Sequence, residues 1–284
     1  MIHRAIHRQA GFSIISLMIA SAIGLFLIGG AGKIYLDSKD AFTARSAAAT
    51  AAESSRFALQ DLRRYLVMAG RGIIEQDDSP DAYSAADNNL RTYPAVDPDN
   101  SVAAATTGII DQDIDGNSAV AVRYAVGPPP CGRGERIDST HTVRFYVNDE
   151  SKLMCQSIET VGGLLDIDNL HERERPMLSG VISMRVLYGV DTDTGSAEDQ
   201  IANQYLTATE VENAGLWISV VSIRIGLVIS SDTQELPNAY QPHDVERMNV
   251  LGMEVFAPDT SHAYKAVNAT ISLRNLNSIG MSRQ

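Results

Sequence analysis

A run of 21 residues without a charged side chain, from Phe12 to Gly32, lies near the start of the chain. As an α-helix this run would be about 32 Å long, which is enough to cross the hydrocarbon core of a bilayer. Lys33 ends the run. An apolar helix of this length can be a cleaved secretory signal, a permanent anchor or an element of assembly, so the residues around it must decide between these roles.

The charged residues that flank the apolar run indicate its orientation. Arg4 and Arg8 precede it, so the positive-inside rule places the N-terminus in the cytoplasm and the residues beyond about 33 on the other side of the membrane. That compartment permits disulfides. The only cysteines, Cys131 and Cys155, are therefore predicted to form a disulfide, because the sequence has no C-x-x-C motif and no Cys/His cluster.

The composition of the chain indicates a folded protein and argues against one class of partner, nucleic acid. The 284 residues are 44% hydrophobic, which is enough for a substantial core, and the formal net charge is −12. From Phe12 onward, 21 basic residues face 35 acidic ones. Such a surface repels phosphate backbones, so we expect no binding to nucleic acid.

The helical pattern continues beyond Lys33. Residues 33–70 are rich in Ala, Leu, Arg and Glu and contain no proline, and Leu59, Leu62, Leu66 and Ala69 recur at helical spacing on one face. Read as one element, Phe12 to Gly70 would be a helix of roughly 88 Å. Its first third is expected in lipid, and its last third is expected to pack one face on a soluble domain.

Strand patterns follow a long segment without periodicity. Residues 75–118 are rich in Pro, Asp, Asn and Ser, which predicts a surface loop. Alternating, β-branched segments then predict strands at 119–126, 142–147, 152–158, 181–188, 220–230 and 266–273. The expected fold class is α+β, with the long N-terminal helix packed on an antiparallel sheet in one soluble domain.

The junction at the start of the apolar run resembles a known processing signal. A short basic leader ends at Gly11, Phe12 would become the new N-terminus, and an apolar helix follows at once. This arrangement is similar to the class III signal of type IV prepilins and type II secretion pseudopilins. Further segments resemble, in order, parts of the PilW family of type IV pilus minor pilins: "SSRFALQDLRRYLVMAGR" (54–71), the pair Cys131 and Cys155, "RVLYGVDTDTG" (185–195), "VVSIRIGLVISS" (220–231) and "ATISLRN" (269–275).

The resemblance implies a pilin-like architecture and a maturation pathway. We expect cleavage after Gly11 and N-methylation of Phe12. The chain then divides into a prepilin leader (1–11), a transmembrane and assembly helix (12–32), an amphipathic continuation of that helix (33–72) and a β-rich soluble domain (73–284).

The resemblance also implies where the protein acts and with what. Before assembly it would be a single-pass inner-membrane protein with a cytoplasmic N-terminus, and afterwards part of a pilus on the cell surface. The implied partners are other minor pilins, the major pilin, a prepilin peptidase and a tip adhesin of the PilY family. The processes served would be adhesion and twitching motility. We expect the protein to need no cofactor.

Ser16 departs from the pilin pattern. Most pilins carry Glu as the fifth residue of the processed chain, where its carboxylate can pair with the terminal ammonium of the preceding subunit. A carboxylate in lipid is costly and is retained only with a partner. Ser16 therefore favours a subunit near the tip of the fibre, with no earlier neighbour to meet. The alternative is tolerated drift, because a serine hydroxyl can bond the carbonyl one turn back at little cost.

Two acidic segments partly match a calcium-binding loop. Asp111, Asp113 and Asp115 alternate as in the first half of such a loop, but Val122 stands where the bidentate Glu is required. The segment "DTDTG" (191–195) is shorter still. Ordinary turns between strands are the favoured interpretation of both, so no metal site is predicted.

No catalytic pattern is present. The six histidines are scattered without an H-E-x-x-H motif, and there is no G-x-S-x-G, P-loop or G-x-G-x-x-G. We therefore expect no catalytic residues and no enzyme. Two alternatives to a minor pilin of a type IV pilus stay open: a minor pseudopilin of a type II secretion system, and a periplasmic enzyme held by a signal anchor.

Overall fold

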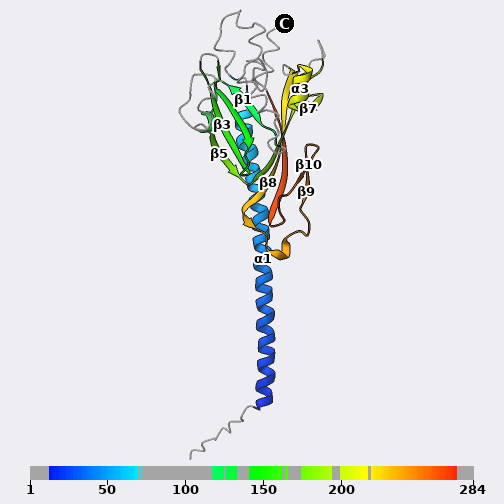
Figure 1. Cartoon of the computed structure of the whole chain (residues 1–284). Coiled ribbons are helices and arrows are strands. Elements are labelled where there is room, and N and C mark those ends of the chain that lie inside the picture. The colour runs from blue at the N-terminus through cyan, green and yellow to red at the C-terminus, as the bar shows by residue number, and fades with distance from the viewer. Residues whose placement is uncertain are drawn as a thin grey trace, which may run out of the picture.

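A long helix carries a β-rich head at its C-terminal end in this computed structural model (Figure 1). The structure describes residues 13–69, 71, 117–124, 126–132, 141–161, 164–165, 174–193, 199–216 and 219–273. The predicted leader and nearly all of the predicted loop at 75–118 lie outside these residues.

Helix α1 runs from Ile14 to Leu66 without interruption. Its 53 residues make it about 80 Å long. The sequence predicted a helix that ends at Gly70, but the last residues form tighter turns, in which the amides of Met68 and Ala69 bond carbonyls three residues back. Arg63 and Arg64 lie in the last turn, where positive charge interacts favourably with the helix dipole.

Burial divides α1 into a bare half and a packed half. The side chains before Asp40 are almost all exposed, and the first buried residue is Ala47. From there buried residues recur every three or four positions, which is the pattern of a helix with one face on a core. They are Ala47, Ala51, Ser55, Ala58, Leu62, Tyr65 and Leu66.

Two antiparallel sheets surround the packed half of α1. The first contains β1 (Val120–Tyr124), β2 (His141–Val147), β3 (Lys152–Val161), β4 (Leu164–Leu165) and β5 (Glu174–Ser179), with β3 pairing with β2, β4 and β5. The second has the order β11-β8-β6-β7, from β11 (His262–Ser272), β8 (Val220–Glu235), β6 (Val181–Val190) and β7 (Gln204–Leu206).

Smaller elements complete the head. Helix α3 (Ala208–Ala214) follows β7, and a hairpin of β9 (Arg247–Val250) and β10 (Met253–Phe256) lies between β8 and β11 along the chain. Short 3₁₀ helices occupy Pro130–Gly132 and Asn238–Tyr240. The predicted α+β class is confirmed, and a strand is present at each of the predicted positions. The expectation of one sheet was incomplete, because the strands divide into two sheets and a separate hairpin.

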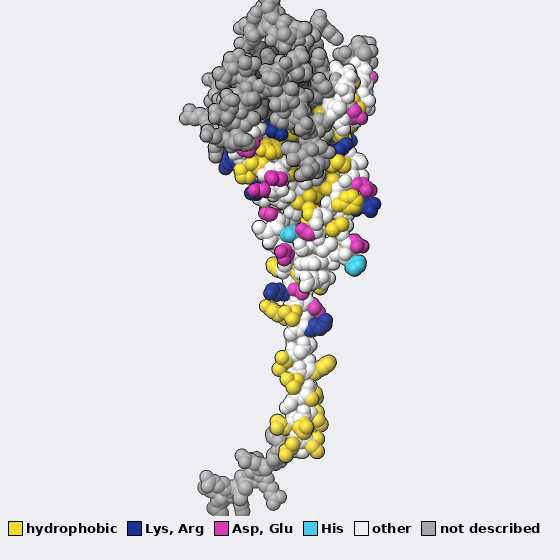
Figure 2. Space-filling view, viewed as in Figure 1, with side chains coloured by type: hydrophobic (Ala, Val, Ile, Leu, Met, Phe, Trp, Pro, Cys, Tyr) yellow, Lys and Arg dark blue, Asp and Glu magenta, His cyan; other side chains and the backbone are white. Residues whose placement is uncertain are grey.

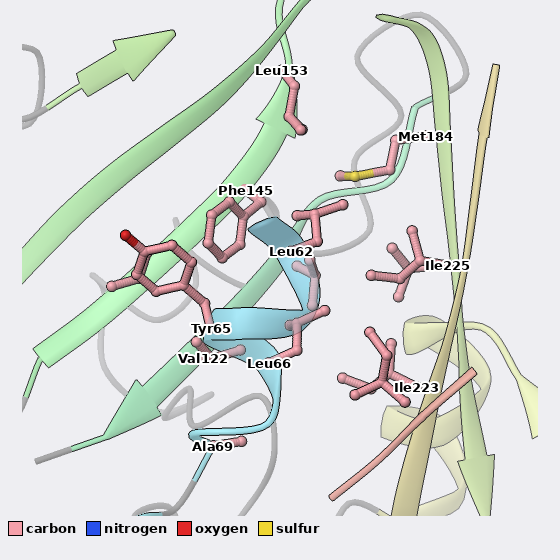
Figure 3. Packing of buried hydrophobic residues seen from close by; sticks show 14 of the residues in the cluster. Leu62, Tyr65, Leu66, Ala69, Val122, Phe145, Leu153, Met184, Ile223 and Ile225 are labelled. Atoms are coloured by element: carbon pink, nitrogen blue, oxygen red, sulfur yellow. The ribbon is translucent and has the colours of Figure 1, made fainter. Parts of the chain in front are cut away.

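The main core lies between the two sheets and the last turns of α1. Figure 3 shows Leu62 and Leu66 of the helix between Phe145 of the first sheet and Ile223 and Ile225 of the second. All five side chains are fully buried. Burying a leucine or phenylalanine side chain contributes about 2 kcal/mol, so this layer joins the helix firmly to both sheets.

A second, smaller core lies on the other face of the second sheet. Val228 of β8 packs there with Met248, Val250 and Ala257. Gly226 makes this approach possible, because a Cβ atom at this position would collide with the Val250 side chain. The second sheet is therefore covered by α1 on one face and, in part, by the β9–β10 hairpin on the other.

Candidate assembly helix and neighbouring sites

The bare half of α1 is an apolar surface with no cover in the isolated chain. Figure 2 shows hydrophobic side chains around this half of the helix, in the lower part of the view. Its large apolar side chains are more than half exposed, and they include Ile14, Leu17, Phe26, Ile28 and Ile34. Among the described residues, α1 is the one helix long and apolar enough to cross a membrane, judged by length and composition, and no part of its apolar window is buried.

A water-exposed stem separates this surface from the head. Lys33 and Asp37 are the first charged residues of the described chain and form an exposed pair at 3.6 Å, one helical turn apart. From Lys33 to the first buried residue, Ala47, the helix rises about 21 Å. Phe42, with 73% of its surface exposed, lies on this stem.

Ser16 lies in the first turn of α1, and its side chain is exposed. Nothing in the described chain pairs with this position from outside the helix, so its role depends on neighbouring subunits. The hydroxyl of Ser21 donates to the carbonyl of Leu17 at 2.8 Å, which shows how a serine is accommodated in this apolar helix. Gly11 and Phe12, the predicted cleavage and methylation positions, lie outside the described residues.

The predicted disulfide is confirmed by the structure. Cys131, in the 3₁₀ helix at Pro130–Gly132, is bonded to Cys155 of β3, with their Cα atoms 5.6 Å apart. Cys155 is completely buried, and a guanidinium nitrogen of Arg175 donates to the carbonyl of Cys131 at 3.4 Å. The bond ties the segment after β1 to the middle of the first sheet.

Of the two acidic segments noted in the sequence, the structure describes only part of the second. Asp111, Asp113 and Asp115 lie outside the described residues. The carboxylate oxygens of Asp191, Asp193 and Asp199 lie within 4.8 Å of one another. The sequence did not predict this cluster, because Asp199 lies outside the segment 191–195 and comes near it only through folding.

The Asp191 carboxylate in that cluster already has hydrogen-bond donors. Its two oxygens accept from the backbone amides of Asp193, at 3.0 Å, and Gln200, at 2.9 Å. These bonds account for a nearly buried carboxylate at the end of β6 and give it a role in holding the turn together.

A second polar cluster, at Asp259–Tyr264, was missed in the sequence. The Asp259 carboxylate accepts from the Ser261 hydroxyl at 3.0 Å and lies 3.0 Å from Nδ1 of His262. Desolvation raises the pKa of Asp259, but hydrogen bonds from His262, Ser261 and Tyr264 together lower this pKa to about 2.

The geometry of this cluster does not suit nucleophilic catalysis. The Ser261 hydroxyl and the Asp259 carboxylate both lie beside the same imidazole nitrogen, Nδ1, whereas a catalytic triad places them on opposite nitrogens. The cluster instead closes the turn into β11. The signal in the sequence was Asp259 followed two residues later by Ser261, the spacing of an Asp side chain that bonds the backbone ahead of it.

Part of the head is similar in sequence to a known protein family. Residues 140–275 match the family PilW, described as type IV pilus-assembly protein W. The match begins at the start of β2 and extends just past β11, so it includes most of both sheets. The resemblance to the PilW family is confirmed for this segment, and it supports a pilus-related role.

A solved structure is also similar to the chain. It is a type IV-like pilin from Thermus thermophilus, with 12% sequence identity and a TM-score of 0.33, and the similarity covers 58% of this chain and 82% of that one. No curated protein matches the chain.

Proposed function

We propose that this protein is a minor pilin that helps to initiate assembly of a type IV pilus and is incorporated near its tip. The observation that carries the proposal is the division of α1. One half is a bare apolar helix, and the other half is built into the core of a domain that matches the PilW family. Adhesion and twitching motility are the processes that such a fibre would serve.

The division of α1 suggests a mechanism in which the bare half exchanges one apolar environment for another. Before assembly its side chains would lie in the lipid of the inner membrane, and afterwards against the helices of other pilins. Association between helices in lipid depends on close packing and not on the hydrophobic effect, so a helix can leave lipid for a packed fibre at little net cost. Contacts of the head would then determine which subunits lie beside it. We propose that these are other minor pilins, the major pilin and a tip adhesin of the PilY family.

Ser16 is the basis for the position near the tip. A subunit within the shaft would need a carboxylate in the first turn of α1 to meet the ammonium of the subunit before it. Ser16 cannot supply a charge at this position. A subunit at the tip has no earlier neighbour, so the absence of the carboxylate carries no cost there.

Processing at Gly11 tests the pilin assignment. Mass spectrometry of the protein from membranes should find N-methylated Phe12 as its first residue. Replacing Gly11 with Leu should leave the leader attached, because a bulky residue blocks the peptidase, whereas the control Ser13→Ala should be processed normally. Recovery of intact Met1, or cleavage near Gly32, would mean that the helix is an ordinary anchor or a secretory signal.

A minor pseudopilin of a type II secretion system is the second candidate. The same leader and bare helix would suit such a subunit, and a tip pseudopilin also lacks the carboxylate that Ser16 replaces. Deletion of the gene separates the two candidates: a minor pilin should be required for normal pilus number, whereas a pseudopilin should be required for protein secretion with pili unaffected. The family match at residues 140–275 favours the pilus.

A further inference from the structure

Strand β11 forms a long edge of the second sheet. Among the described residues it pairs with β8 alone, along the whole segment from Tyr264 to Ser272. An edge strand presents unpaired backbone groups that can bind another chain, and proteins usually shorten, bend or cover such edges. Two other edge strands of the described sheets follow this rule, because β7 has three residues and β5 contains Pro176.

The pairing with β8 shows which backbone groups of β11 have no partner strand within the described part of the chain. The amide of Leu273 donates to the carbonyl of Val221, its partner in the register. In an antiparallel pair such hydrogen-bonded positions alternate, so the odd-numbered residues of β11 bond to β8 and the even-numbered ones point their amides and carbonyls away from the sheet. The free positions on the accessible stretch are Ala266, Asn268, Thr270 and Ser272.

Within the structure as described, the side chains of these positions do not cover the edge. All four are exposed, and all are small or short. The N-terminal end of β11 is different, because Tyr264 packs against the β9–β10 hairpin and the amide of Ala263 bonds the hydroxyl of Ser231. The open edge therefore extends from Ala266 to Ser272, about 23 Å of strand.

A groove runs beside the C-terminal part of this edge. It has a volume of about 340 Å³ and is lined by Arg63, Val67, Met68 and Arg71 from the end of α1 and by Thr270, Ile271 and Ser272 from β11. Arg63 and Arg71 have exposed side chains, and Val67, Met68 and Ile271 supply an apolar floor. The described residues that line the groove include no carboxylate, although the chain as a whole has a net charge of −12.

We propose that the β11 edge and this groove bind an extended strand from a different polypeptide of the pilus assembly. The strand would pair with the free backbone groups at 266–272 and extend the sheet. Alternate side chains of an added strand point to the same face, so those that face α1 would enter the groove. The groove fits a strand that carries an apolar residue for the Val67–Met68–Ile271 floor and an acidic residue for Arg63 and Arg71.

A photo-crosslinking amino acid at Ser272 tests the inference in cells that assemble pili. Ser272 lines the groove, and its side chain is exposed, so the substitution should not disturb the core. We expect cross-links to one segment of another protein, identified by peptide mass spectrometry, in which an apolar residue and an acidic residue lie two positions apart and so share one face of the strand. A cross-link to a second copy of this chain, a cross-link within the same chain, or no cross-link would overturn the proposal.

Two pairs of variants show which groups bind the strand. Asn268→Pro removes an amide that points away from β8, and it should reduce cross-linking at least tenfold, whereas Asn268→Ala keeps that amide and should retain cross-linking. Arg63→Glu reverses a charge in the groove and should reduce cross-linking by a similar factor. Arg64→Glu, in the same turn of α1 but outside the groove, is the matched control. Equal effects within either pair would contradict binding at this edge.

The inference relies on the proposed function only for the source of the strand. Processing of the leader is therefore measured on the same samples. If the assignment as a pilin or pseudopilin fails, the protein keeps Met1 or is cleaved near Gly32, whereas if the strand-binding proposal fails, protein that begins at Phe12 is present without the expected cross-link.

Discussion

The proposed position near the tip depends on one residue of the apolar helix, Ser16. Its neighbours in α1 are exposed apolar residues that any membrane helix could share. The sequence alone was enough to identify this residue, because its meaning depends on distance from the expected cleavage point and not on folding. The Asp259 cluster could not be predicted in this way, because its side chains come into contact only when the turn before β11 has formed.

A carboxylate at position 16 should not improve the function of this subunit. In Ser16→Glu a charge enters lipid before assembly at a cost of about 2 to 4 kcal/mol. We expect lower or unchanged incorporation, measured by immunogold labelling of pili. Ser21→Glu, another serine of the same helix, controls for the cost of the charge. Increased incorporation along the shaft with Ser16→Glu, but not with Ser21→Glu, would show that Ser16 is drift and that the tip proposal is wrong.

The low pKa of Asp259 predicts an acid-sensitive turn. Its pKa is about 2 in the folded protein and about 3.9 in an unfolded chain. Because the folded pKa is the lower one, the stabilisation is present above pH 4 and is lost as the pH falls from 4 to 2. The side chain is 40% exposed, so solvent screening limits the effect to about 1 kcal/mol.

Denaturant titration of the full chain in detergent measures this effect. The free energy of unfolding should fall more steeply between pH 4 and pH 2 in the wild type than in Asp259→Asn. The exposed carboxylate of Asp244 provides the control, and Asp244→Asn should follow the wild type. Parallel curves for wild type and Asp259→Asn would mean that the hydrogen bonds of the cluster add no stability.

At the scale of elements, alternation of apolar and polar residues predicted the long strands. Several shorter elements were not predicted, and the reasons lie in their residues. Strand β5 contains Pro176, which argues against a strand unless it lies at an edge. The β9–β10 hairpin turns at Leu251 and Gly252, with φ of 51° and 87°, and leucine gives no signal for a turn that needs positive φ at both positions.

The sequence contains a signal for the start of helix α3, although the helix was not predicted. The Thr207 hydroxyl accepts from the amide of Glu210 at 3.3 Å, and the Glu210 carboxylate accepts from the amide of Thr207 at 2.8 Å. This reciprocal pair is a capping box, which a search for Thr-x-x-Glu would have found. Its helix has only seven residues and little apolar periodicity, which explains the omission.

Loss of the disulfide should destabilise the head without changing its fold. Closing a loop of about 25 residues contributes roughly 3.5 kcal/mol in the chain-entropy model. The double variant Cys131→Ser/Cys155→Ser should therefore unfold at a lower denaturant concentration, measured on the full chain. Wild type treated with reductant should shift by a similar amount. If both thiols react with an alkylating reagent in protein taken directly from the periplasmic face, the bond does not form in the cell.

The hairpin should move when Gly226 gains a side chain. Gly226→Ala places a methyl group against Val250, and such overpacking costs about 1 to 3 kcal/mol. Hydrogen exchange of the β9–β10 amides should rise, while that of the Leu62 and Leu66 region stays unchanged. Adding Val250→Ala removes the collision and should restore part of the protection. Unchanged exchange in the single variant would mean that the hairpin does not depend on this approach.

At the scale of the whole molecule, the sequence predicted the order of the parts but not how they enclose one another. The bare and packed halves of α1 followed from charge and periodicity. The enclosure of α1 between two sheets did not, because single strand patterns do not state which strands become neighbours. The groove beside β11 was hidden for the same reason, since it joins residues about 200 positions apart along the chain.

The proposed position at the tip predicts that the protein is scarce. Quantitative mass spectrometry of sheared pili should find it at no more than about one hundredth of the major pilin, because a fibre has one tip and many shaft subunits. Deletion should lower the number of pili per cell, with the helical repeat of the remaining fibres unchanged. An abundance comparable to that of the major pilin would place the subunit in the shaft.

The enclosure of α1 also determines how the molecule responds to tension. A pull on the N-terminal end of the helix acts along its axis, and the buried side chains from Ala58 to Leu66 pack in the core between the two sheets. Such a load shears many contacts at the same time, whereas a pull across a sheet edge would open them one after another. A retracting or stretched fibre would therefore strain the joint between subunits before it drew the helix out of its own head.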